Sequence, residues 1–351
     1  MSAPRSALIV RLSSIGDVVH TLPAYAAIRD AWPDTDLGWA VEPAAAPLVR
    51  RLPGLKVHVL DTAAWRRNLW RPSTWSAVRR ARAELRAARY ERAFDFQGLI
   101  KSAQVARHSG ARVVGLARED LRETLAARWY DDLAPATPAD SHIVERGLGV
   151  VRTAGISTGE PRFPRLYNEQ DEANVERMLA GTGYDRFIVA HGAANWSSKQ
   201  WPVDRQAAAG RDLYRRTGLP VLWLWGPGEL EATRRTALAA GEGNHVAFRT
   251  SLPQLAALIR RASLFVGGDS APLHLAVACR TPIVAVFGPT SPQRLGPLDP
   301  ADRVVTALQP CSFCHRRRCP LGTRACLETL PAADVVDAAI ERLSAPVARA
   351  G

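Results

Sequence analysis

Ala7-Leu8-Ile9-Val10-Arg11-Leu12 is a short apolar run that ends in the polar, glycine-containing stretch Ser13-Ser14-Ile15-Gly16-Asp17. Apolar residues then recur at helical spacing as far as Ala31. This succession predicts a strand, a loop and a helix. Similar strand-like runs follow at residues 37–41, 57–60, 92–96 and 112–116, with helical stretches between several of them. Strands that alternate with helices indicate a parallel sheet covered on both faces.

A second series of the same kind follows a linker. Between Ile156 and Tyr167 the chain is rich in Ser, Thr and Gly and contains Pro161 and Pro164, which is typical of an interdomain segment. Further strands are expected at residues 187–191, 221–225, 264–267 and 283–287. We therefore expect two α/β domains, residues 1–160 and 161–330. The last segment, residues 331–351, is expected to form a helix that packs back on the N-terminal domain.

The composition is that of a folded protein with a basic surface. The chain has 351 residues, of which 47% are hydrophobic, so it can bury a sizeable core. The start lacks the pattern of a secretory leader, and no apolar run approaches the roughly 18 residues of a membrane span, so we expect a cytosolic protein. The net charge of +12 favours an anionic partner: nucleic acid, phospholipid or a phosphorylated sugar.

The residues directly after the strands carry the candidate chemistry, because ligands of open parallel sheets bind there. Asp17 follows the first strand, where a carboxylate could take a proton from an attacking hydroxyl or only cap the helix. In the second half, the small residues Gly192, Ala193 and Ala194 leave a strand and lead to Lys199. Such a loop lets backbone amides approach a phosphate, and a lysine adds a point charge.

The stretch from Val266 to Ala276 is the most informative. A strand breaks into Gly267-Gly268-Asp269-Ser270, and a helix is predicted to begin near Pro272, offering amide donors to a diphosphate. Such a terminus can stabilise a departing nucleotide diphosphate without a metal. Glu229 follows another strand and could accept hydrogen bonds from sugar hydroxyls, or simply begin a helix. Neither GxxxxGK[ST] nor GxGxxG occurs here, which removes the usual support for an NTPase or a dehydrogenase.

Five segments together resemble glycosyltransferase family nine, the ADP-heptose:lipopolysaccharide heptosyltransferases, and come closest to heptosyltransferase I. They are residues 13–23, 95–103, 199–202, 268–276 and 287–290. The resemblance implies a GT-B fold, in which two Rossmann-like domains with parallel sheets face a central cleft. It also implies inverting, metal-independent transfer of heptose from ADP-heptose to the lipopolysaccharide inner core, either to Kdo or to the first heptose.

The resemblance also assigns roles to residues. Asp17 would deprotonate the acceptor hydroxyl, and Lys199 would neutralise the diphosphate. The donor would be bound by Glu229, Asp269, Ser270, Ala271, His274 and Thr290. The anionic acceptor would be bound by Lys101, Arg122, Arg66 and Arg67. The Arg- and Trp-rich stretch from Trp65 onward also suits transient contact with the cytoplasmic face of the inner membrane.

Three alanines depart from the family pattern. Relatives similar to heptosyltransferase I tend to carry hydroxyl residues where Ala193 and Ala194 stand, and glycine where Ala271 stands. A family-nine-like transferase with another nucleotide sugar therefore stays an alternative, as does a sugar-nucleotide epimerase on the same fold. A nucleic-acid-binding protein is a more remote alternative, because no recognised nucleic-acid motif accompanies the positive charge.

Four cysteines crowd near the end of the chain. Cys311, Cys314, Cys319 and Cys326 are separated by two, four and six residues, which supplies enough ligands for a closed tetrahedral zinc site. Reduced packing thiols and a disulfide are the alternatives. No cofactor is expected to be needed for catalysis.

Overall fold

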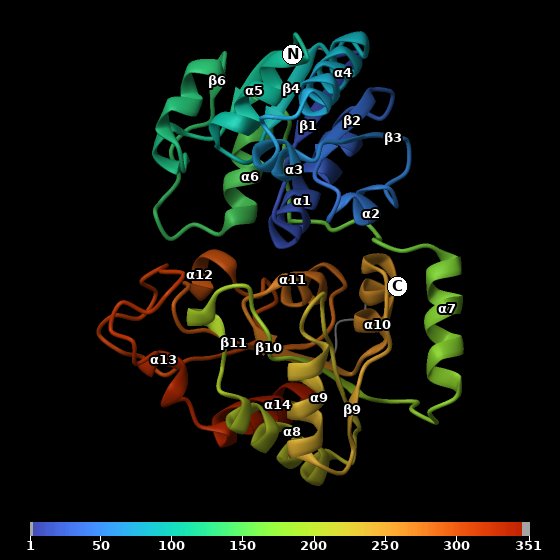
Figure 1. Ribbon diagram of the computed structural model, residues 1–351, viewed down its shortest axis with the longest axis vertical. Helices are drawn as coiled ribbons and strands as arrows, with labels where there is room; N and C mark the ends of the chain where they lie inside the picture. Colours follow the sequence, from blue (N-terminus) through green and yellow to red (C-terminus); the bar gives the residue numbers. More distant parts are fainter. Residues whose placement is uncertain (1–2, 346–351) are drawn as a thin grey trace. The chain divides into compact units, whose positions relative to one another are not determined.

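The computed structural model describes residues 3–345 and divides the chain into two compact units, residues 1–166 and 167–351. The division falls six residues after the expected boundary, at the end of the proline-containing linker. Each unit holds one six-stranded parallel sheet with helices on its faces (Figure 1). The two α/β domains predicted from the alternating pattern are therefore confirmed. Among the described residues, no helix combines the length and the apolarity that a membrane span needs.

The strand order of the first unit is β3-β2-β1-β4-β5-β6. Its strands are β1 (Ser6–Val10), β2 (Asp36–Val41), β3 (Leu55–Val59), β4 (Arg92–Asp95), β5 (Arg112–Gly115) and β6 (Asp132–Leu133). Its helices are α1 (Ile15–Ala31), α2 (Ala46–Val49), α3 (Thr62–Arg67), α4 (Pro72–Ala87), α5 (Ile100–His108) and α6 (Ile143–Thr153), with short 3-10 turns η1 (Arg118–Asp120) and η2 (Thr124–Trp129). The order reverses between β1 and β4.

The second unit repeats this order as β12-β11-β10-β7-β8-β9. Its strands are β7 (Ile188–His191), β8 (Val221–Trp223), β9 (Asn244–Val246), β10 (Leu264–Gly268), β11 (Ile283–Val286) and β12 (Arg303–Val305). Its helical segments are α7 (Glu169–Ala180), η3 (Ser197–Lys199), α8 (Val203–Thr217), α9 (Leu230–Ala240), α10 (Leu252–Arg261), α11 (Ala271–Ala278), α12 (Pro292–Leu295), α13 (Ala325–Glu328) and α14 (Ala332–Ser344). Here the order reverses between β7 and β10.

The cores explain the nearly continuous apolar strands. In β1, Leu8 and Val10 pack with Leu85 of α4 and Val105 of α5, while the alternate residue Ile9 is buried on the opposite face. Both faces of this strand are thus covered, as in other parallel sheets with crossover helices. In the second unit, β7, β8, β10 and β11 share one apolar cluster with α8 and α14.

The C-terminal helix corrects one expectation. Helix α14 packs against α8, β11 and β12 of its own unit, where Val335, Val336 and Ala339 join the core. The sequence analysis expected this segment to pack back on the N-terminal domain. That choice was wrong for residues 332–344, because the apolar face of α14 completes the cover of the second sheet. Residues 346–351 lie outside the described part of the chain.

Candidate active site

The reversal points of the two strand orders are where ligands of such sheets bind. At each one, two loops leave the carboxyl ends of neighbouring strands in opposite directions. In the first unit these loops follow β1 and β4, and in the second they follow β7 and β10. Most of the predicted catalytic and donor-binding residues fall into these two places, whereas Glu229 follows β8 and Thr290 follows β11.

Asp17 lies in the first turn of α1, beyond β1. Its Oδ2 accepts hydrogen bonds from the backbone N–H and the hydroxyl of Ser14, at 2.9 and 2.8 Å. Its Oδ1 is 2.6 Å from Nη2 of the buried Arg11, and 30% of the Asp17 side chain remains exposed. Asp17 is therefore the third-position residue of a capping box whose N-cap is Ser14, and it is also a partly exposed carboxylate. Its role as a general base stays a prediction.

Neighbouring charges govern the protonation of Asp17. Burial alone raises its pKa, but the Arg11 guanidinium, the Ser14 backbone N–H and His20 outweigh that effect and lower the pKa to about 2. The carboxylate is consequently ionised at neutral pH. Arg11 also donates to the backbone carbonyl of Phe96, which ties the end of β1 to the end of β4.

The predicted acceptor residues occupy the same edge of the first sheet. Lys101 Nζ lies 3.0 Å from Oε1 of Glu42 and 3.3 Å from the hydroxyl of Thr62, so three segments meet at this ammonium. Arg66 and Arg67 are exposed on α3. The exposed Arg122 precedes Glu123, whose carboxylate accepts a 2.7 Å hydrogen bond from the first backbone N–H of α5.

The second reversal point gathers a lysine, an aspartate and a histidine. Lys199 Nζ lies 2.6 Å from Oδ2 of Asp269, and His274 Nε2 lies 3.1 Å from Oδ1. Burial raises the pKa of Asp269, but hydrogen bonding to His274 and the charge of Lys199 lower it far more. The carboxylate thus holds the lysine in place, and only one of the three ammonium protons is used in doing so.

A second polar chain runs beside this group. Glu229 begins α9 and accepts hydrogen bonds from Gly226 N at 2.6 Å and His191 Nε2 at 3.2 Å. Hydrogen bonding to His191 lowers the pKa of Glu229. The other ring nitrogen of His191 lies 3.0 Å from the hydroxyl of Ser270, the residue that caps α11. Predicted residues on two separate loops are thereby joined through a histidine.

Ala271 and Thr290 complete the predicted donor set. Ala271 is the first residue of α11, in agreement with the predicted start near Pro272. Thr290 lies in the loop after β11, where its hydroxyl is buried and has no hydrogen-bond partner within residues 3–345. A buried hydroxyl of this kind is available to a ligand that reaches it.

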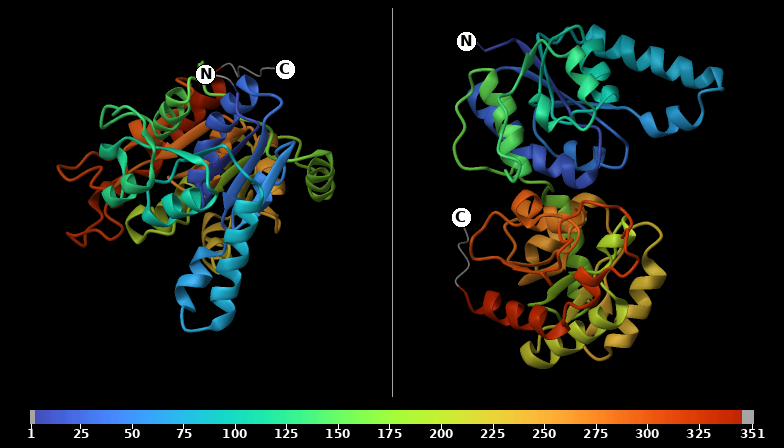
Figure 2. Two further views of the ribbon diagram at one scale, coloured as in Figure 1. Left: turned by 90° about the horizontal axis from the view of Figure 1, so that it is seen from above. Right: turned by 90° about the vertical axis from the view of Figure 1, so that its left-hand side faces the viewer.

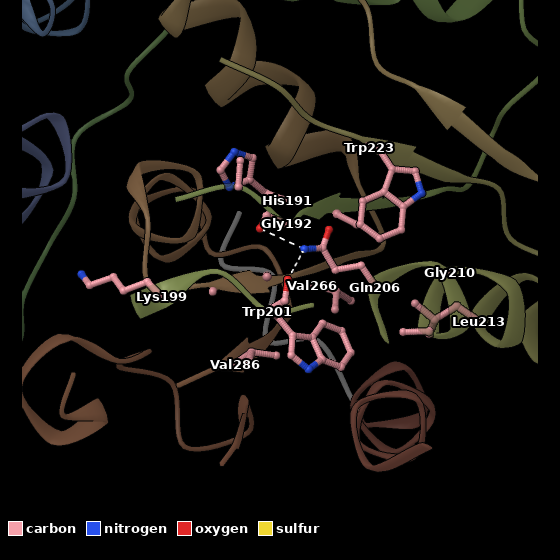
Figure 3. Close-up of a pocket in the computed structure, with 15 residues that line it drawn as sticks. His191, Gly192, Lys199, Trp201, Gln206, Gly210, Leu213, Trp223, Val266 and Val286 are labelled. Atoms are coloured by element: carbon pink, nitrogen blue, oxygen red, sulfur yellow. Dashed lines mark hydrogen bonds between the residues drawn. The ribbon is translucent and has the colours of Figure 1, made fainter. Parts of the chain in front are cut away.

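Behind these groups, a pocket runs between the sheet and α8 (Figure 3). Gln206 of α8 donates to the carbonyl oxygens of Gly192 and Trp201, at 3.1 and 2.6 Å, and so fixes the loop that leads to Lys199. A Cβ atom on Gly192 would stand 1.7 Å from Gln206 Oε1, which explains the glycine. Lys199 itself extends away from Gln206 (Figure 3).

The zinc site expected from the four clustered cysteines stays a prediction. Within residues 3–345, no three His, Cys, Asp or Glu side chains are grouped so that they could hold a metal ion. All four thiols are free, and they occupy different environments: Cys311 and Cys314 are exposed, whereas Cys326 is buried. Burial raises the pKa of the Cys326 thiol, and the nearby thiols of Cys311, Cys314 and Cys319 raise it further.

The cysteine-containing loop has another structural effect. Ser198, the neighbour of Lys199, donates from its hydroxyl to the carbonyl of Arg316 at 2.6 Å. The backbone N–H of His315 donates to the carbonyl of Pro289 at 2.7 Å, next to Thr290. Residues 309–326 therefore connect the Lys199 loop with the Thr290 loop.

A family model described as glycosyltransferase family 9 (heptosyltransferase) matches residues 78–324. The chain belongs to this family. Lipopolysaccharide heptosyltransferase 1 of Pseudomonas aeruginosa is 32% identical over 89% of this chain and 86% of its own length. The protein of the same name from Escherichia coli K12 is 30% identical over 82% of this chain and 89% of its own. The solved E. coli heptosyltransferase WaaC with ADP superposes with a TM-score of 0.76 at 26% identity, over 96% and 99% of the two chains.

Family 9 membership confirms the resemblance drawn from the five motifs. It makes the chain a glycosyltransferase, and the two parallel sheets agree with the GT-B fold class. The epimerase and nucleic-acid-binding alternatives are thereby set aside. The structure adds two residues that the sequence analysis did not single out as functional, Arg11 and His191. Both stand at or next to the last residue of a strand, which is the signal that could have pointed to them.

Proposed function

We propose that this family 9 protein transfers heptose from ADP-heptose to an inner-core sugar of lipopolysaccharide, either Kdo or the first heptose. Its similarity to proteins named lipopolysaccharide heptosyltransferase 1 supports the donor and the acceptor class. The observation that carries the proposal is the Lys199–Asp269 pair at 2.6 Å, beside the start of α11. A fixed ammonium next to a helix N-terminus suits a diphosphate that gains charge as it leaves.

The reaction follows from the groups present. Asp17 accepts the proton of the acceptor hydroxyl while that oxygen attacks the anomeric carbon of the heptose. The bond between the anomeric carbon and the diphosphate oxygen breaks, and ADP departs with its charge balanced by Lys199 and the α11 amides. A single displacement of this kind inverts the anomeric configuration. In this proposal the positive groups of the protein stabilise the leaving group, so no metal ion is required.

The weak basicity of Asp17 fits a concerted step. A carboxylate with a pKa of about 2 does not remove a proton from a free hydroxyl in advance. It accepts the proton as the acceptor oxygen forms its new bond and becomes acidic. Arg11 keeps the carboxylate oriented during this transfer, because it holds Oδ1 and leaves the rest of the group partly exposed.

Donor binding is assigned to the second unit. His191 and Glu229 offer a polar wall for nucleoside or sugar hydroxyls, and Asp269 and His274 fix Lys199. Acceptor phosphates would meet the cationic side chains Lys101, Arg66, Arg67 and Arg122 on the first unit. Ala193 and Ala194 provide fewer hydroxyl donors than related sites, and Ala271 stands in place of a glycine, so ADP-heptose is tested against other ADP- and UDP-sugars.

The direct test is ADP release with ADP-heptose and heptose-deficient lipopolysaccharide. Wild type should turn over, and Asp17→Asn should lower kcat by about 100-fold or more, because positioned proton transfer contributes about 10²–10⁴-fold. Asp30→Asn is the matched control, since it removes a carboxylate from the same helix where 60% of the side chain is exposed. Full turnover by Asp17→Asn would remove this residue from catalysis, and no turnover by wild type with any ADP-sugar would refute the donor assignment.

A further inference from the structure

A helical hairpin projects from the first unit. Helix α3 has no buried residue, and α4 buries only Thr74 and Leu85 along its length. Both views of Figure 2 show the pair extending away from the sheet of its unit. The hairpin is attached to the core near its base, where Trp65 and Ala81 pack against the cluster that contains Leu85. The base of the hairpin is thus packed on the core of its unit, and the tip extends away from that core.

The tip carries an apolar surface. Leu69, Trp70 and Trp75 are 53, 74 and 52% exposed, in and just after the turn that joins the two helices. The indole N–H of Trp75 donates to the carbonyl of Leu69 at 2.8 Å. The Thr74 hydroxyl donates to the carbonyl of Asn68, also at 2.8 Å. These two hydrogen bonds fix the conformation of the turn. Because the indole N–H of Trp75 is already paired, the exposed surface of this side chain is mainly carbon.

Basic side chains surround this tip. Residues 62–89 contain eight arginines and one acidic residue, Glu84. The structure pairs none of these eight guanidinium groups with a carboxylate within residues 3–345. Arginines behind exposed tryptophans match the anionic headgroups and the apolar boundary of a lipid bilayer. Two copies of so cationic a hairpin would repel each other, which disfavours self-association.

We propose that Leu69, Trp70 and Trp75 form a membrane-docking tip that inserts into the headgroup boundary of an anionic bilayer, while the neighbouring arginines contact lipid phosphates. This inference deepens the proposed function and rests on it, because the acceptor assigned there is lipid-linked. Contacts at the base of the hairpin link it to the predicted acceptor-binding residues. Thr62, the first residue of α3, donates to Glu42, the carboxylate that also holds Lys101 at 3.0 Å. The hairpin therefore starts at the predicted acceptor-binding edge.

The test measures vesicle binding without substrates. Wild type, the double variant Leu69→Ser/Trp70→Ser and the control Leu238→Ser are sedimented with vesicles of phosphatidylglycerol and phosphatidylcholine, and with phosphatidylcholine alone. Leu238 is 84% exposed on α9 in the second unit, so its substitution removes similar exposed surface elsewhere. We expect wild type and the control to bind the anionic vesicles, and the tip variant to bind about tenfold more weakly or worse.

Turnover distinguishes this inference from the proposed function. The tip variant should keep wild-type kcat with a deacylated, water-soluble acceptor and lose rate only with acceptor embedded in vesicles. Equal vesicle binding by the tip variant and wild type would overturn the docking tip, as would wild type that turns over but does not bind anionic vesicles. A tip variant that changes oligomeric state and leaves vesicle binding intact would assign the surface to self-association instead. If wild type shows no transferase activity but binds the vesicles, and the tip variant loses this binding, the docking tip would be upheld and the proposed function refuted.

Discussion

Among the neighbouring groups, Arg11 has the strongest influence on the predicted catalytic carboxylate, Asp17. It is 7% exposed, stands beside the end of β1 and contacts Asp17 at 2.6 Å. Burial of Asp17 opposes ionisation, and Arg11 is the largest effect that favours it. The two residues therefore act as a pair, in which the arginine both orients the carboxylate and keeps it charged.

Substitution of Arg11 should appear in the pH dependence. A group with a lowered pKa stays in its basic form until the pH falls toward that pKa, so wild-type kcat/KM should show no acid limb from Asp17 between about pH 8 and 5. In Arg11→Gln the uncompensated burial raises the pKa of Asp17, and the acid limb should move to higher pH. Arg11→Lys should restore most of the wild-type profile. Identical profiles for wild type and Arg11→Gln would show that Arg11 has only a structural role.

Single residues were predictable where a motif marked them. Asp17, Lys199, Asp269 and His274 were expected from their places after strands, and the structure brings the last three together. Arg11 and His191 were not identified, because a polar residue at the end of an apolar strand looks like an ordinary strand terminus. Their contacts with Asp17 and Glu229 depend on side-chain directions that spacing does not give. The four cysteines were noticed from their close spacing along the chain, and Cys311, Cys314 and Cys319 do act on the pKa of Cys326, while the zinc site stays a prediction.

At the scale of elements, close packing of β10 on β7 requires a glycine. A Cβ atom on Gly267 would stand 2.7 Å from the carbonyl oxygen of His191. Gly267→Ala should force the two strands apart and lower the free energy of unfolding by about 1–3 kcal/mol. Displacement of His191 should also weaken ADP binding.

Gly181→Ala is the matched control for this substitution. Gly181 has a φ of −77° and open space around its Cα, so alanine fits there without strain. Urea unfolding followed by circular dichroism measures both variants. A Gly267→Ala protein as stable as Gly181→Ala would contradict the packing argument.

The central strands were predictable and three edge strands were not. The nine predicted runs match nine strands to within two residues at each end: β1, β2, β3, β4, β5, β7, β8, β10 and β11. β6, β9 and β12 have two or three residues each and lie at sheet edges, where only one neighbour is present. Short edge strands need no long apolar run, so the pattern that identifies buried strands is absent from them.

At the scale of the whole molecule, the same strand order occurs twice and gives each unit one reversal point. The first unit supplies a carboxylate held by an arginine, and the second supplies a lysine held by an aspartate. In the proposed mechanism the two roles are chemically distinct: the carboxylate would take a proton, and the lysine would stabilise a leaving diphosphate. The alternation of strands and helices predicted the two parallel sheets, although it did not predict that α14 covers the second sheet.

The division of labour between the units is tested by measuring ADP affinity and turnover on the same two variants. Isothermal titration with ADP and the ADP-release assay are applied to Asp17→Asn and Lys199→Gln. The account predicts wild-type ADP affinity with lost turnover for Asp17→Asn. For Lys199→Gln it predicts at least about tenfold weaker ADP binding, since a charged hydrogen bond contributes about 1.5–3 kcal/mol. Unchanged ADP affinity in Lys199→Gln, or ADP binding lost in Asp17→Asn, would contradict it.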